Sequence, residues 1–375
     1  MSNNSISITR SNQVKGIAII LMMVKHLFGS DSYLTLESSH WFAFFPGFVK
    51  IIYHSASLAL PIFLFFSGYG LYKSYISKPN PKPTYILQRI IKTLIPYWIV
   101  MAFTIVYLII KGKFEVKYLF INLFSLLHND DILYVSFSWF IKLYLGLILL
   151  LPLFRMLQFK IKLSGKKRFI LDCVIYLVIP AVIGLALKRF YHEKTYIDML
   201  TFILSSIRLV FWYFSSFGVG ILFAKYNIYE KIRYYADMLP RALVLITTPM
   251  FCLSVLLVKY FISYKTVTEV FYTVVFTISC LLFLDYLNLN VKWDVLAFLG
   301  KHSVFYWLLS GFFFLNTSEL QFIIYYPRYH LLIVVWLLLL LTPMVFLCNW
   351  LSGILTKPIC NAIDKIGKPA KAQKQ

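Results

Sequence analysis

Charged residues are scarce in this chain of 375 residues. Lys, Arg, Asp and Glu together make up 14% of it, whereas soluble domains carry about 25%. The shortage is greatest for the acids, since 15 Asp and Glu stand against 37 Lys and Arg. Apolar residues reach 60% and come in many runs separated by short basic connections. This pattern excludes a soluble domain with a single anchor and indicates an all-α, polytopic membrane protein.

Cysteine is also scarce, and a cleavable leader is missing. The five cysteines are Cys173, Cys252, Cys280, Cys348 and Cys360. No Cys-x-x-Cys pair and no metal-ligand spacing connects them, so we expect neither a disulfide scaffold nor a metal site. The first apolar run contains Lys25 and is not followed by a small-x-small site. We therefore expect it to be retained as a membrane helix.

The apolar runs predict about ten transmembrane helices. They cover residues 15–28, 57–76, 93–110, 138–154, 169–187, 204–224, 241–262, 267–284, 295–315 and 330–352. We expect residues 1–356 to form one integral membrane domain and residues 357–375 to form a basic cytoplasmic tail near anionic lipid. Internal repeats of the kind found in many transporters are not visible.

The basic residues lie in the connections, and they set the expected orientation. With a cytoplasmic N-terminus, the segments on that side hold roughly twice as many Lys and Arg as the opposite segments, which predicts that both termini are cytoplasmic. The net charge of +22 is explained by this topology, so we expect a lipid bilayer and no nucleic acid as partner. A composition rich in Lys and Ile is typical of bacteria with AT-rich genomes, which indicates a bacterial cytoplasmic membrane.

The stretch from Lys15 to Phe28 combines an apolar helix with ionisable side chains. At 100° per residue, the steps from Lys15 to His26 come to about three turns plus 20°, so both side chains share one face, roughly 16 Å apart along the axis. Ionisable residues that face the interior of a membrane protein usually mark a pathway or a reaction site. The alternative is that His26 lies at the water interface, where such side chains are also common.

Six motifs follow one another along the chain. They are Arg10 to Leu21 with His26, Leu60 to Tyr69, Arg89 to Tyr97, Trp139-Phe140 running on to Pro152, Phe217 to Gly220, and Leu299-Gly300-Lys301-His302-Ser303. Each motif is common by itself, but their order over residues 10–352 resembles the acyltransferase-3 family of integral membrane acyltransferases. Two positions differ from the family pattern: Asn12 stands where aspartate is usual, and Ser310 where a histidine often occurs. The second change either impairs activity or redirects it to another acceptor.

The resemblance implies transfer of an acyl group, usually acetyl from acetyl-CoA, to a hydroxyl of a surface polysaccharide or its lipid-linked precursor. The acyl-CoA is then a donor substrate, and no permanently bound cofactor is expected. Lys15, Arg89 and Lys92 at inner helix ends would contact the phosphates of CoA, with His302 as a further contact. Ordinary positive-inside anchoring is the competing interpretation of these cations.

In the same framework, His26 would act as general base toward the acceptor hydroxyl, or would carry the acyl group transiently. Ser67, Tyr69 and Ser303 are candidate donors to the oxyanion. A Ser-Gly pair in a membrane helix is, however, more often a close-packing site. A carrier or flippase for a lipid-linked sugar or a small solute remains the main alternative, followed by a glycan polymerase and by a non-catalytic sensor or scaffold.

Overall fold

A computed structural model describes residues 5–28, 46–124, 134–135, 138–190, 199–262, 267–287, 294–312 and 321–366. Within these ranges all the secondary-structure elements are helices, which confirms the predicted all-α fold. The α-helices are α1 (Ile8–Phe28), α3 (Pro46–Ser55), α4 (Ala59–Leu71), α5 (Tyr85–Ile110), α6 (Leu119–Leu123), α7 (Trp139–Leu149), α8 (Leu151–Lys160), α9 (Gly165–Cys173), α10 (Ile179–Phe190), α11 (Met199–Tyr226), α12 (Ile228–Ala236), α13 (Arg241–Phe261), α14 (Val267–Leu287), α15 (Val295–Lys301), α16 (Ser303–Gly311), α17 (Gln321–Tyr325) and α18 (His330–Ile366).

Eight helical segments of the described chain are long and apolar enough to cross a membrane. They are Ile51–Ile76, Tyr85–Ile110, Trp139–Lys160, Gly165–Leu187, Ser206–Tyr226, Arg241–Phe261, Glu269–Leu287 and His330–Lys365. Each overlaps one of the ten predicted spans. The other two predictions fall on α1, which carries several cations, and on α15 and α16, which are separated by a break at His302. The count of ten and the orientation of the termini therefore stay predictions.

Several helix ends differ from the sequence prediction. Helix α5 begins at Tyr85, so Arg89 and Lys92 lie within its first turns and not before it. The span predicted at 138–154 bends after Leu149, because Pro152 lies in the first turn of the next helix, α8. The separation of the runs at 241–262 and 267–284 into two helices is confirmed.

The last helix continues to Ile366, beyond the predicted span end at 352 and the predicted boundary at 356. Its final turns are held by Asp364, whose carboxylate accepts hydrogen bonds from Lys82, Thr84 and Gln88 at 3.2, 2.7 and 2.7 Å. These contacts dock the end of α18 on the start of α5, which explains why the helix does not stop at the apolar run. The rest of the predicted basic tail, residues 367–375, lies outside the described residues.

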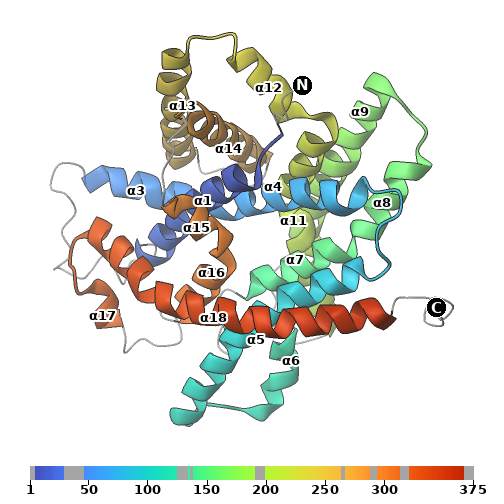
Figure 1. The fold of residues 1–375 in the computed structure, drawn as a ribbon. Coiled ribbons are helices and arrows are strands. Elements are labelled where there is room, and N and C mark those ends of the chain that lie inside the picture. Colours follow the sequence, from blue (N-terminus) through green and yellow to red (C-terminus); the bar gives the residue numbers. More distant parts are fainter. Residues whose placement is uncertain are drawn as a thin grey trace.

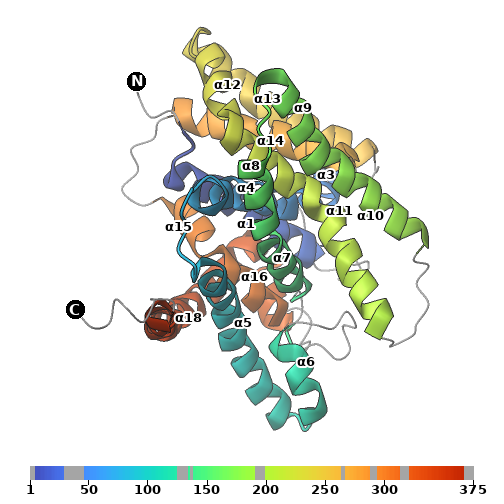
Figure 2. The ribbon, with the colours of Figure 1, turned by 90° about the vertical axis from the view of Figure 1, so that its right-hand side faces the viewer.

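Helices α1 and α4 occupy the middle of the bundle in two perpendicular views (Figures 1 and 2). Helix α1 crosses α15 where two glycines meet: a Cβ on Gly16 would lie 2.1 Å from the Leu296 carbonyl oxygen, and one on Gly300 would lie 1.8 Å from that of Asn12. Helix α4 crosses α11 through Gly68 in the same way, with the Phe217 oxygen 2.0 Å from the position of a Cβ. Small residues at these crossings let the backbones touch.

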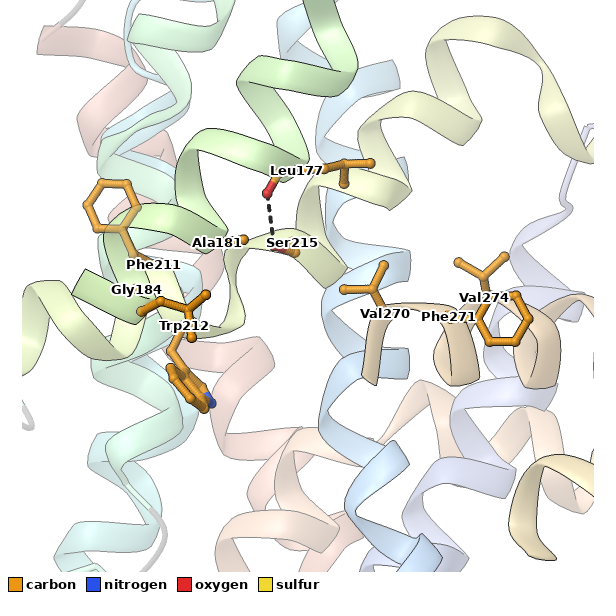
Figure 3. Close-up of a pocket in the computed structure, with 10 residues that line it drawn as sticks. Leu177, Ala181, Gly184, Phe211, Trp212, Ser215, Val270, Phe271 and Val274 are labelled. Carbon is orange, nitrogen blue, oxygen red and sulfur yellow. Dashed lines mark hydrogen bonds between the residues drawn. The ribbon is translucent and has the colours of Figure 1, made fainter. Parts of the chain in front are cut away.

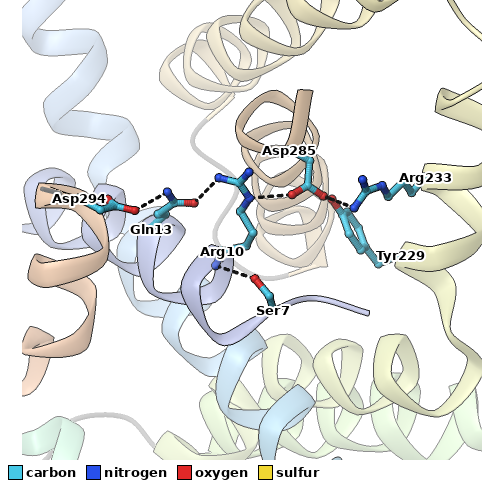
Figure 4. A network of polar contacts seen from close by, with 7 residues as sticks. All are labelled: Ser7, Arg10, Gln13, Tyr229, Arg233, Asp285 and Asp294. Carbon is cyan, nitrogen blue, oxygen red and sulfur yellow. Dashed lines mark hydrogen bonds and ion pairs between the residues drawn. The ribbon is translucent and has the colours of Figure 1, made fainter. Parts of the chain in front are cut away.

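Polar side chains join one end of α1 to three other helices (Figure 4). Arg10 donates to Asp285 of α14 at 2.7 Å, and the same carboxylate accepts from Tyr229 and Arg233 of α12 at 2.6 and 2.9 Å. Burial raises the pKa of the Tyr229 phenol, and the neighbouring Asp285 carboxylate raises it further, so the phenol stays a donor. Gln13 extends the network to α15.

Asp285→Asn is expected to lower the free energy of unfolding by about 1–2 kcal/mol, because a neutral amide replaces the charge that both guanidinium groups contact. Thermal unfolding of the purified protein in a neutral detergent measures the effect. Asp237→Asn is a matched control, since Asp237 is exposed and contacts only the Tyr286 hydroxyl among the bonds described. Equal melting temperatures for the two variants would show that the network contributes nothing.

Candidate active site

Two partly buried cations from different helices lie against aromatic side chains of the core. Lys15 of α1 has its Nζ 5.8 Å from the centre of the Phe66 ring, and Arg89 of α5 donates to the Tyr144 hydroxyl at 3.3 Å. Among the described residues neither pairs with a carboxylate. Two partly buried cations without a counter-ion favour an anionic ligand between them.

An aromatic stack leads from Arg89 into the bundle. The Tyr144 ring stacks on Phe140 at 6.0 Å, and Phe140 stacks on Trp307 at 4.8 Å. Trp307 also meets the edge of Phe63 at 5.8 Å. These rings come from α4, α7 and α16, so they form one aromatic stack that begins at the partner of Arg89 and ends at Phe63 in the core.

Helix α16 presents a buried polar face at the same place. Ser303, Trp307 and Ser310 lie one turn apart on it. Ser310 is fully buried, and its hydroxyl donates to the Trp307 carbonyl at 2.7 Å. The Trp307 indole N–H is buried and reaches no acceptor among the described residues. A buried donor of this kind is costly unless something accepts from it, so Trp307 joins the candidate site.

His26 lies in the last turn of the unbroken helix α1, so its helical spacing from Lys15 is as predicted. Its ring is half-buried. Two contacts hold this turn: the Tyr325 hydroxyl donates to the Leu27 carbonyl at 2.8 Å, and the Phe28 ring lies 4.7 Å from that of His330. His330 is a buried histidine at the start of α18. It lies against the last turn of α1.

Comparison with known families identifies the family of this chain. Residues 8–353 match the acyltransferase-3 family model, whose description is an acyltransferase domain. The chain belongs to this family. It is therefore a membrane acyltransferase, and the match runs from the first residue of α1 into α18. No curated protein and no solved structure matches the chain.

The other residues predicted for this acyltransferase are dispersed. Lys92 is exposed on α5. His302 is buried at the break between α15 and α16, with its ring 4.8 Å from that of Phe298 and a hydrogen bond to Asn349. His302 is therefore held by packing contacts within the fold.

The three predicted oxyanion donors also differ from one another. The Ser67 hydroxyl donates to the Phe63 carbonyl of its own helix at 2.8 Å, while Gly68 makes the crossing with α11. This arrangement agrees with the close-packing interpretation of the Ser-Gly pair. Tyr69 is buried and lies under the Lys73 ammonium, 4.9 Å from it. Ser303 is buried on the polar face of α16.

Sequence reasoning missed Trp307 and His330. Trp307 lies inside the predicted span 295–315, and this position was a signal against an interfacial role. His330 is the first residue of the last predicted span, 330–352. His128, Asp130 and Asp131, which the sequence places in a polar connection between predicted spans, lie outside the described residues.

An apolar cavity of about 320 Å³ lies elsewhere, between α10, α11 and α14 (Figure 3). Leu177, Trp212, Val270 and Phe271 are among the residues that line it, and its one marked hydrogen bond joins the Ser215 hydroxyl to the Leu177 carbonyl at 3.4 Å. None of the candidate site residues lines this cavity, so we assign it no part in the reaction.

Proposed function

We propose that this membrane acyltransferase moves an acyl group, acetyl in the first instance, from cytosolic acyl-CoA to a hydroxyl of a cell-envelope polysaccharide or its lipid-linked precursor. The observation that carries the proposal is the match to the acyltransferase-3 family, together with two partly buried cations, Lys15 beside Phe66 and Arg89 beside Tyr144, that pair with no carboxylate among the described residues. Acyl-CoA is a polyanion, and its phosphates are the group that such a pair of cations binds best. A bacterial cytoplasmic membrane is the proposed location.

The aromatic stack gives the donor a path inward. With its phosphates at Lys15 and Arg89, the pantetheine arm would run along the rings of Phe140 and Trp307 toward the interior. His26 lies roughly 16 Å from Lys15 along α1. This distance suits a reaction in which the phosphates of the donor bind near Lys15 and the thioester reaches the His26 end of the helix.

At the thioester, His26 would accept the proton of the acceptor hydroxyl as the new C–O bond forms. The oxyanion that develops would be stabilised by donors such as Ser303, Tyr69 and the Trp307 indole N–H. The C–S bond then breaks, and protonated His26 returns the proton to the leaving thiolate. An acyl-His26 intermediate would use the same residues in two steps.

Arg89→Gln is expected to raise the KM for acyl-CoA about tenfold while changing kcat less, because one charge-assisted contact to phosphate is worth roughly 1.5–3 kcal/mol. Initial rates of CoA release over a range of acyl-CoA concentrations separate the two constants. Lys113→Gln provides the control, since Lys113 is an exposed cation just beyond the opposite end of α5. A KM that stays constant in Arg89→Gln would remove this residue from the donor site.

The function itself is tested by mass spectrometry of the surface polysaccharide from cells with and without the protein. We expect the acyl mass increment to disappear when the gene is deleted and to return with the wild-type chain. A glycan whose acylation is the same in both strains, together with a fall in its surface amount, would favour a carrier or flippase. The acyl mass identifies acetyl or a longer group directly.

A further inference from the structure

A second, strongly basic cavity of about 720 Å³ lies between α8, α9, α11 and α12. Four cationic side chains line it: Lys166, Arg168, Lys225 and Lys231. No acidic residue is among its lining residues. A cavity of this charge attracts anions.

Two of the four cations are fixed from behind. Asp172 is 1% exposed and contacts Arg168 Nε at 3.1 Å and Lys225 Nζ at 2.5 Å. The Tyr226 hydroxyl donates to the same carboxylate at 2.5 Å. One carboxylate neutralises only one of two buried cations, so a net positive charge remains. The position of this charge is also fixed, because the Arg168 guanidinium donates to the backbone carbonyls of Leu157 in α8 and of Ile161 in the α8–α9 connection.

Two helix amino ends border the same cavity. Gly165 is the first residue of α9, and Ile228 is the first residue of α12. The capping residues Ser164 and Asn227 make no side-chain cap hydrogen bond, so backbone N–H groups of both first turns are available. Such N–H groups and the helix dipole favour an anion. The exposed ammonium groups of Lys166 and Lys231 belong to these same turns.

The cavity also lies at the level of the membrane surface. Three candidate spans, Trp139–Lys160, Gly165–Leu187 and Ser206–Tyr226, have ends beside it. Neither Lys15 nor Arg89 lines it, so it is separate from the proposed donor site. A basic pocket between helices at this level is suited to a phosphate headgroup.

We propose that this cavity binds a phosphate-bearing anion, which is either the headgroup of an anionic phospholipid or a soluble phosphate ester. Arg168 and Lys225 provide the fixed positive charge, the two helix ends provide backbone donors, and Lys166 and Lys231 close on the ligand from the mouth. The site does not depend on the acyl-transfer reaction.

Binding is tested with the purified full chain in neutral detergent. Three soluble probes are titrated: dihexanoyl phosphatidylglycerol, dihexanoyl phosphatidylcholine as the lipid without net charge, and inorganic pyrophosphate. We expect the double variant Lys166→Gln/Lys231→Gln to raise the Kd for the bound anion about tenfold or more, because two charged contacts are lost. Both lysines are exposed, so the fold is retained. The matched control is Lys160→Gln/Lys162→Gln, which removes two exposed lysines that do not line the cavity.

The pattern of binding identifies the ligand source. Saturable binding of phosphatidylglycerol that only the cavity variant weakens supports the headgroup, and the same result with pyrophosphate supports a soluble phosphate ester. Absence of binding by both anions, or an equal loss in the cavity variant and its control, overturns the proposal. Because acylation is not measured, failure here would leave the proposed transferase function untouched.

Discussion

His26→Ala is expected to abolish acylation of the envelope glycan while the protein remains in the membrane at its normal abundance. Loss of a general base costs typically 10²- to 10⁴-fold in rate, and loss of an acyl-carrying histidine would stop the reaction. The substitution lies in the last turn of α1, where the side chain is partly exposed and shortening it leaves the helix backbone unchanged, so the protein should still fold. Mass spectrometry of the glycan and immunoblotting of the membrane fraction give the two readings.

His54→Ala is the control for removing a histidine from this chain. His54 is exposed near the end of α3, where its ring contacts those of Tyr53 and Tyr260. We expect normal acylation in this variant. A His26→Ala strain that acylates its glycan as the wild type does would refute the base and the acyl-carrier roles together. Loss of acylation in both histidine variants would point to a general folding defect instead.

The position of His26 and Lys15 on one helix could be predicted because it needs only helical periodicity along a single stretch. The position of Arg89 relative to Lys15 could not be predicted from periodicity alone, since it depends on how the surrounding helices place α1 and α5. The resemblance to a family, and the expectation that both residues lie at inner helix ends, predicted a shared role for them in binding the donor. The helices are apolar on most sides, so the direction in which each one faces cannot be read from its pattern.

That ambiguity explains what was missed. Trp307 and His330 became candidates because of contacts with other helices, to Phe140 and to Phe28 respectively. No local sequence pattern distinguishes them from the aromatic and histidine residues of a membrane interface. The basic cavity was hidden for a related reason. Lys166 and Lys231 fit the positive-inside rule as anchors, and only the folded chain brings them to one cavity.

The glycines give more information about helix packing than the aromatic residues do, because a close helix crossing leaves no room for a side chain at the contact. Gly300→Ala is expected to lower the free energy of unfolding by about 3 kcal/mol, at the upper end for overpacked sites. The new Cβ would lie 1.8 Å from the Asn12 carbonyl oxygen and 2.9 Å from the Gly16 nitrogen. Both are backbone atoms, so α1 and α15 must separate. Thermal unfolding in detergent measures the loss.

The same separation should reduce acylation in the protein that still folds, since α1 carries both Lys15 and His26 and a displacement of about 1 Å can cost 10²-fold in rate. Gly353→Ala is the matched control in α18, where a Cβ would meet nothing within 4 Å. There alanine should stabilise the helix by roughly 0.5–1 kcal/mol. The two variants are thus expected to shift the melting temperature in opposite directions. A shift of the same sign in both would contradict the close contact of α1 with α15 on which the site depends.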